Sequence, residues 1–126
     1  MSLNFGLLKT FDAKERWQQD GSSLKNISST IVTATPYTVT AGKKLYIKSI
    51  IISFEDEGDA FDVDNGDSLD IKDNATTKLG LNFNALQQGV TQTHTFNVPL
   101  IFETNITQTQ GGSTFHGDIT YIGWEE

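Results

Sequence analysis

The chain has 126 residues, a formal net charge of −7 and no cysteine, and 37% of its residues are hydrophobic. This length fits one domain with one core, and the hydrophobic content argues against general disorder. The absence of cysteine excludes disulfides, thiolate metal sites and cysteine nucleophiles, while the acidic charge disfavours a nucleic-acid partner, whose phosphates require a basic surface.

The first 29 residues differ in composition from the rest, and we interpret them as an N-terminal arm followed by a linker. Asp12 and Glu15 have the spacing of a capping box and Gly21 is a suitable stop, so a short helix is expected over residues 13–19. Because so short a helix is unstable alone, its apolar side chains should dock on the domain or on a partner. We favour a partner, and the candidate docking residues are Leu7, Leu8, Phe11 and Trp17. The Ser- and Asn-rich residues 22–29 form the expected linker.

From Thr30 onward, β-branched and aromatic runs alternate with turn residues, which predicts short strands. The first strand, over residues 31–39, is expected at a sheet edge because Pro36 has no amide donor. The next predicted strand covers residues 44–54. Its second half is apolar on both sides, and we expect both sides to be buried. An acidic hairpin is predicted around the Asn65-Gly66 turn. The remaining predicted strands cover residues 60–63, 68–72, 78–84, 90–98, 100–108 and 114–124, with breaks at Pro99 and at Gly111 and Gly112.

The expected fold follows from the many short strands, which have no helical segments between them to make parallel crossovers. The sequence therefore predicts an all-β antiparallel sandwich over residues 30–126, with a short N-terminal arm. A jelly roll is the topology that we expect, and an immunoglobulin topology stays open.

The acidic residues are concentrated between positions 55 and 73. This stretch contains one base, Lys72, and nine acids: Glu55, Asp56, Glu57, Asp59, Asp62, Asp64, Asp67, Asp70 and Asp73. Carboxylates at Asp62, Asp64, Asp67 and Asp73 suit calcium, but an EF-hand loop needs glycine at position six and glutamate at position twelve, where this chain has Asp67 and Asp73. We therefore expect a solvated acidic hairpin without a metal, and calcium is the alternative.

Two further motifs bear on chemistry. Gly66-Asp67-Ser68-Leu69 resembles the signature of the GDSL lipases and esterases, which take their histidine base from an Asp-x-x-His segment. Neither His94 nor His116 has that context, so no catalytic residue, zinc site or cofactor is predicted.

The flat aromatic side chains could form a sugar-stacking platform, although core packing explains them as well. The candidates for such a platform are Trp17, Tyr37, Tyr46, Tyr121 and Trp124.

Two passages resemble small β-sandwich proteins of tailed-phage particles. They are residues 37–53, YTVTAGKKLYIKSIIIS, and residues 111–126, GGSTFHGDITYIGWEE, about a quarter of the chain together. In such proteins the first resembles a strand entered through a Gly-Lys turn, and the second resembles the closing strand. The resemblance implies a capsid-decorating, head-fibre or tail-associated protein, often trimeric, with an arm for attachment and a β head facing solvent.

The sequence thus leads to the hypothesis of a non-enzymatic virion structural or attachment protein. Its expected partners are further copies of itself, as a homotrimer, other virion proteins and a host-surface glycan. We expect synthesis in the cytoplasm and no membrane insertion, because there is no signal peptide and no apolar run near the ~18 residues that a spanning helix needs. The alternative from a different class is a carbohydrate-binding module.

Overall fold

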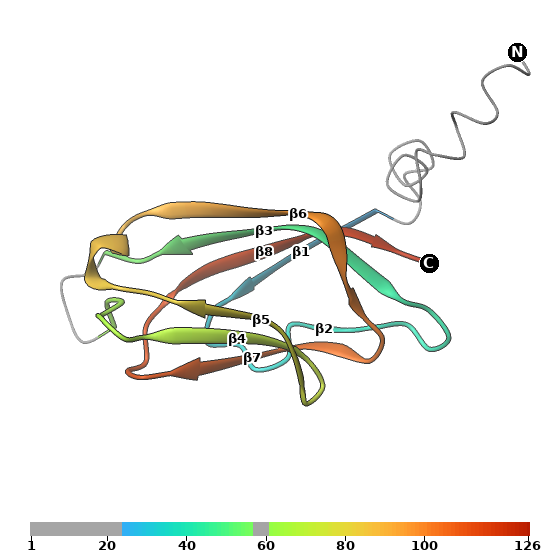
Figure 1. Ribbon diagram of the computed structural model, residues 1–126, viewed down its shortest axis with the longest axis horizontal. Helices are drawn as coiled ribbons and strands as arrows, with labels where there is room; N and C mark the ends of the chain where they lie inside the picture. Colours follow the sequence, from blue (N-terminus) through green and yellow to red (C-terminus); the bar gives the residue numbers. More distant parts are fainter. Residues whose placement is uncertain (1–23, 57–60) are drawn as a thin grey trace, which may run out of the picture.

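The computed structural model describes residues 24–56 and 61–126, and it shows two four-stranded antiparallel sheets packed face to face (Figure 1). Sheet I has the strand order β1-β8-β3-β6 and sheet II the order β2-β7-β4-β5. The strands are β1 (Leu24–Thr30), β2 (Tyr37–Thr38), β3 (Leu45–Phe54), β4 (Ser68–Asp73), β5 (Thr76–Asn82), β6 (Thr91–Phe102), β7 (Asn105–Gly111) and β8 (Gly117–Glu125), with one 3-10 turn, η2 (Ala85–Gln87). The predicted all-β antiparallel sandwich is confirmed.

The strands pair as a nested set. β4 pairs with β5, β3 with β6, β2 with β7 and β1 with β8, as though one long hairpin had been wound into two layers. Contacts between β3 and β8 and between β4 and β7 join these pairs into the two sheets. In the described part of the chain, no helix is long and apolar enough to cross a bilayer.

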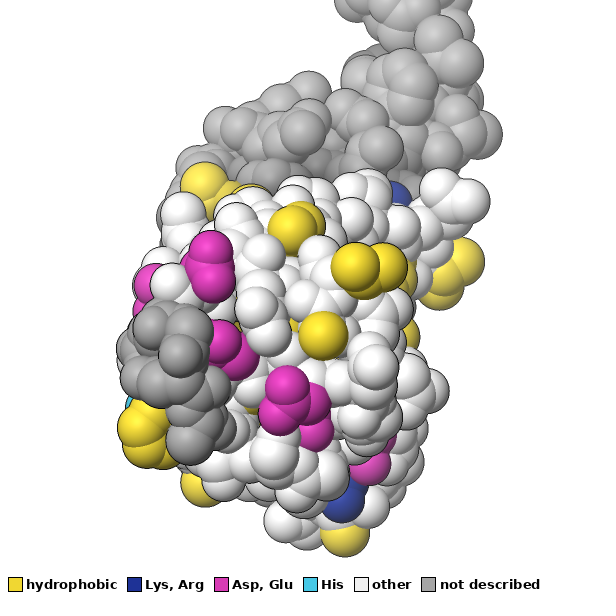
Figure 2. Space-filling model, turned by 90° about the vertical axis from the view of Figure 1, so that its left-hand side faces the viewer, with side chains coloured by type: hydrophobic (Ala, Val, Ile, Leu, Met, Phe, Trp, Pro, Cys, Tyr) yellow, Lys and Arg dark blue, Asp and Glu magenta, His cyan; other side chains and the backbone are white. Residues whose placement is uncertain are grey.

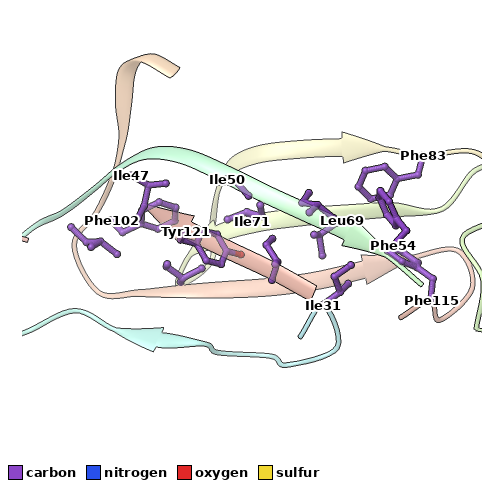
Figure 3. Close-up of a cluster of buried hydrophobic side chains, with 14 of the residues drawn as sticks. Ile31, Ile47, Ile50, Phe54, Leu69, Ile71, Phe83, Phe102, Phe115 and Tyr121 are labelled. Atoms are coloured by element: carbon purple, nitrogen blue, oxygen red, sulfur yellow. The ribbon is translucent and has the colours of Figure 1, made fainter. Parts of the chain in front are cut away.

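The core lies between the sheets, and inward side chains of both contribute to it (Figure 3). At one end, the rings of Phe54, Phe83 and Phe115 pack against one another, with Phe54 and Phe83 edge to face at 4.8 Å between centroids. Along the strand predicted over residues 78–84, Phe83 is buried and Leu79 and Leu81 pack against the core. The middle of the core consists of Ile47, Ile50, Ile52, Leu69, Ile71, Phe102, Ile106, Ile119 and Tyr121.

A β-bulge explains why β3 looked apolar on both sides. The register of β3 against both neighbours shifts between Ile47 and Ser49. Leu45 and Ile47 before the shift and Ile50, Ile52 and Phe54 after it are therefore all buried in the same core. One extra residue changes which positions face inward, so the prediction of burial on both sides was wrong. Ile51, on the outer side, is only half-buried.

The first strand begins earlier than predicted. Leu24–Thr30 is an edge strand paired with β8, so residues 24–29 are not a linker and the β domain does not start at Thr30. Its side chains alternate between exposed and half-buried, which suits an edge strand rich in Ser and Asn. Of the strand predicted over residues 31–39, only Tyr37–Thr38 is a strand. The predicted helix over 13–19 and the rest of the arm lie outside the described residues.

Three other predicted elements differ from the structure. There is no strand over residues 61–63, and β4 pairs with β5 and β7, so the acidic hairpin prediction was wrong. β6 runs through Pro99 to Phe102, because an edge strand tolerates a missing amide donor where the register shifts. The segment predicted as one strand over 100–108 is divided by a turn at Glu103 and Thr104 between β6 and β7.

Candidate interaction surface

The docking residues predicted from sequence, Leu7, Leu8, Phe11 and Trp17, lie outside the described residues. The surface that the structure does present is the outer face of sheet I. Inward positions of β3 and β8 such as Ile50 and Tyr121 are buried, so the positions between them face outward. By the strand register, two neighbouring outward rows are Asn26, Ile122, Ser49 and Thr95, and Ser28, Thr120, Ile51 and Thr93. We call these eight residues the uncharged face.

The hydroxyl groups of this region pair with each other across the strands. Ser49 Oγ lies 3.4 Å from Thr95 Oγ1, and Ser28 Oγ lies 3.4 Å from Thr120 Oγ1. Next to the uncharged face, Ser53 Oγ lies 2.9 Å from Thr91 Oγ1. Because these polar groups have partners within the sheet, covering them with another surface costs less than burying unpaired hydroxyls.

The outer face of sheet II has a different character. Its outward positions include Asp70 and Lys72 on β4 and the exposed Lys78 on β5. On sheet I, the charges nearest to the uncharged face are Lys48 at the bulge and Asp118 at the start of β8. The Lys48 ammonium donates a hydrogen bond of 3.0 Å to the Asn97 carbonyl of β6. The two faces of the sandwich therefore differ in charge, because the two outward rows of sheet I named above carry no charged side chain.

One end of the outer face of sheet I is aromatic. The register places Leu24, Trp124, Tyr46 and Ile101 in one row across the four strands. The rings of Tyr46 and Trp124 are stacked, with centroids 5.2 Å apart and planes 6° from parallel. We call this row the aromatic end. The five aromatic residues weighed as a sugar platform do not share a face, since Tyr121 lies in the core and Tyr37 donates its hydroxyl proton to buried Glu125.

Figure 2 faces one end of the sandwich and shows several separate acidic side chains on it. The four carboxylates considered for calcium do not converge. Asp67 and Asp73 lie next to opposite ends of the six-residue strand β4, roughly 20 Å apart at ~3.3 Å per residue. Each accepts hydrogen bonds from the protein itself, Asp67 from Ser113 and Asp73 from Glu103. Among residues 24–56 and 61–126, no three His, Asp or Glu side chains are placed to hold a metal ion.

The two histidines and Ser68 also lie apart. His94 points inward from β6 opposite Ile50, and its Nε2 atom is buried without a hydrogen-bond partner. His116 precedes β8, where its ring stacks on Phe61 at 4.3 Å and its Nδ1 lies 3.9 Å from Glu55. Ser68 starts β4 and pairs with Asn82 and Gly111. These three residues are not brought together.

Sequence reasoning missed three buried polar residues that tie the two sheets and their loops together: Asp67, Gln108 and Glu125. Glu125 on β8 accepts hydrogen bonds from the Tyr37 hydroxyl at 2.8 Å and from the Thr40 amide and hydroxyl at 3.0 and 2.8 Å. Asp73 accepts from the amides of Glu103, Thr104 and Asn105, and so closes the turn between β6 and β7. The sequence shows that these residues are acidic, but it does not show which distant residues donate hydrogen bonds to them.

These contacts predict a loss of stability in acid. Burial raises the pKa of Glu125 and of Asp73, but the hydrogen bonds outweigh it, so each pKa lies below its ordinary value of 4.5 or 3.8. A lowered pKa in the folded state gives stability that is present above the ordinary pKa and lost as the pH falls through the folded value. The urea midpoint is therefore expected to stay level near neutral pH and to fall below about pH 4.

The matched control is the Asp73→Asn, Glu125→Gln double variant, measured in parallel over the same pH range. Its midpoint should be lower than that of the natural chain at neutral pH, and its decline in acid should be shallower. An acid decline as steep as that of the natural chain would show that other carboxyl groups cause it.

Comparison with known proteins adds no relative: no protein-family profile and no curated protein matches the sequence. The all-β sandwich fold is what the structure shows of this chain.

Proposed function

We propose that this chain is a non-enzymatic structural or attachment protein of a tailed-phage particle, of the capsid-decorating, head-fibre or tail-associated kind. The nested strand pairing supports it. Two four-stranded sheets with the orders β1-β8-β3-β6 and β2-β7-β4-β5 fit a jelly roll, an architecture common among viral capsid and lectin domains. The resemblance of residues 37–53 and 111–126 to such phage proteins supports the same class.

The observation that carries the proposal is the uncharged face. A chain with a net charge of −7 repels its own copies, so two copies approach most easily where charge is absent. The eight outward Ser, Thr, Asn and Ile residues provide such a region on strands that form a rigid scaffold. We propose that a second copy of the chain occupies this face, and that three copies form the functional unit.

A pair of matched substitutions tests this assembly. Thr93 on the uncharged face and Thr109 on sheet II are both exposed and outward-facing strand residues. Light scattering of the natural chain should give a mass three times the 13.9 kDa of one chain. Thr93→Asp adds a negative charge at the contact and should shift the mass to that of one chain, whereas Thr109→Asp should not change it.

Two results would contradict the assembly: a natural chain that is monomeric at every concentration, or equal masses for the two variants. Circular dichroism of both variants shows whether each keeps its strands, so a folding defect is not mistaken for dissociation.

The particle assignment has its own inexpensive test, the genes that flank the coding region. Neighbouring genes for capsid, portal or tail proteins would support a particle component. Neighbouring genes for polysaccharide-degrading enzymes would instead favour the carbohydrate-binding module.

A further inference from the structure

The first outermost strand of sheet I, β1, has backbone groups that point away from the sheet (Figure 1). In an antiparallel pair, residues that bond the neighbouring strand alternate with residues whose amide and carbonyl point to the other side. The Ile31 amide donates to the Gly117 carbonyl at 2.9 Å, so the odd-numbered residues of β1 bond β8. The amides and carbonyls of Asn26 and Ser28 therefore point off the edge of the sheet.

The other outermost strand of sheet I, β6, has the same property. The Phe54 amide donates to the Val90 carbonyl at 3.0 Å, which continues the register between β3 and β6. Even-numbered residues in the first half of β6 therefore bond β3, and the amides of Thr93 and Thr95 point off the sheet. In the described part of the chain, no strand lies on the far side of β1 or of β6.

The edges of sheet II differ, because each has a feature that discourages the addition of another strand. β2 has only two residues. In β5 the register against β4 shifts at Lys78, whose side chain is exposed, so this edge carries both a bulge and a charge. By contrast, β1 pairs regularly over seven residues, and β6 pairs regularly from Thr91 to Thr95, before the irregular half that contains Pro99.

The two edges of sheet I also match each other in direction and charge. All neighbours in this four-stranded sheet are antiparallel, so β1 and β6 run in opposite directions. β1 of one copy can therefore lie antiparallel to β6 of a second copy that has the same orientation. Neither strand contains Asp or Glu, so this contact avoids the repulsion expected elsewhere between chains with a net charge of −7.

We infer that copies of this chain join head to tail, with β1 of one copy hydrogen-bonded to β6 of the next. The edge positions Asn26, Ser28, Thr93 and Thr95 all belong to the uncharged face, so the pairing continues that face from copy to copy. Head-to-tail contacts form a ring when the rotation between copies closes. The inference rests on the proposed function for the number of copies, and it adds the strands through which they join.

Two proline variants test the pairing, because proline at an edge position removes an amide donor that points off the sheet and keeps the bonds to the neighbouring strand. Ser28→Pro blocks β1, and Thr93→Pro blocks β6. In light scattering, the natural chain should have three times the mass of one 13.9 kDa chain, and each variant alone should have the mass of one. An equal mixture of the variants should reach twice that mass, because one intact β1 then meets one intact β6.

The matched control is Asn82→Pro on β5. The next residue, Phe83, donates its amide to the Asp67 carbonyl at 2.8 Å, so the Asn82 amide points off the edge of sheet II. This variant should keep the mass of the natural chain. Circular dichroism of all three variants shows whether each keeps its strands.

The outcomes separate this inference from the proposed assembly. A natural chain that is trimeric while Ser28→Pro is also trimeric would overturn the edge pairing and leave the assembly standing. A natural chain that is monomeric at every concentration would contradict both. Dimers of Thr93→Pro alone would overturn head-to-tail pairing, because they would show β1 pairing with β1. A mixture that stays at the mass of one chain would overturn it as well.

Hydrogen exchange gives a second test that needs no proline. In the natural chain, the amides of Ser28 and Thr95 should exchange several-fold more slowly than the amide of Asn82. In Thr93→Asp, which should have the mass of one chain, the Ser28 and Thr95 amides should exchange as fast as that of Asn82. Fast exchange at Ser28 in a trimeric natural chain would overturn the inference.

Discussion

Replacing Asp67 by alanine is expected to lower the free energy of unfolding by about 3 kcal/mol, because the change removes a buried carboxylate that accepts several hydrogen bonds from the neighbouring loops. The Asp67 side chain is 2% exposed. It accepts hydrogen bonds from the Asp64 amide at 2.8 Å, the Ser113 amide at 2.8 Å and the Ser113 hydroxyl at 2.9 Å. These bonds join the loop before β4 to the turn between β7 and β8 and close one end of the sandwich.

The matched control is Asp64→Ala in the same loop. The Asp64 side chain is exposed, and its backbone groups, which alanine keeps, make the loop contacts. Urea unfolding should therefore show a change within about 0.5 kcal/mol for Asp64→Ala. Similar losses for the two variants would mean that negative charge in the loop, and not the bonds to Asp67, determines its stability.

Replacing Gln108 by leucine should have an effect of similar size, also about 3 kcal/mol. Gln108 Nε2 donates to the carbonyl oxygens of Thr30, Ile31 and Thr33 at 3.0, 3.1 and 2.8 Å. Its Oε1 accepts from the Tyr121 hydroxyl at 2.5 Å. Leucine keeps much of the volume but removes the donor from the buried Ile31 carbonyl and the acceptor from the buried Tyr121 hydroxyl, whereas the Thr30 carbonyl still accepts from the Thr33 amide.

A double-mutant cycle with Tyr121→Phe separates the shared bond from the rest. Tyr121→Phe alone should cost about 1 to 2 kcal/mol, since it orphans only Gln108 Oε1. The double variant removes both partners of the shared bond, so its loss should be smaller than the sum of the single losses. Additive losses would show that the 2.5 Å contact contributes nothing to stability.

The strands were predictable where apolar and polar residues alternate regularly and where the paired strand is near in sequence. Residues 78–84 alternate cleanly, and Leu79, Leu81 and Phe83 do face the core. The pattern failed at β1, where Ser and Asn suggested a linker, because pairing with β8 stabilises an edge strand that its own composition does not favour. It also failed in β3, because a bulge at Lys48 and Ser49 leaves no mark in the sequence.

The candidate surface could not be predicted from the sequence for a different reason. The uncharged face combines residues from β1, β3, β6 and β8, and each strand contributes only two of them. No single stretch looks unusual, whereas the acidic run at residues 55–73 stands out, although Asp67 in a loop and Asp70 on β4 are among its described members and lie in different elements. Likewise, Gln108 and Thr30 are 78 residues apart in sequence, so their bond becomes visible only in the fold.

The central proposal, that the chain is a component of a phage particle, is tested most directly by the protein composition of purified particles of a phage whose genome contains the coding sequence. Quantitative mass spectrometry should find the chain in those particles at a copy number divisible by three. Loss of the chain from the particles should accompany Thr93→Asp but not Thr109→Asp. A chain that is abundant in infected cells and absent from purified particles would contradict the account.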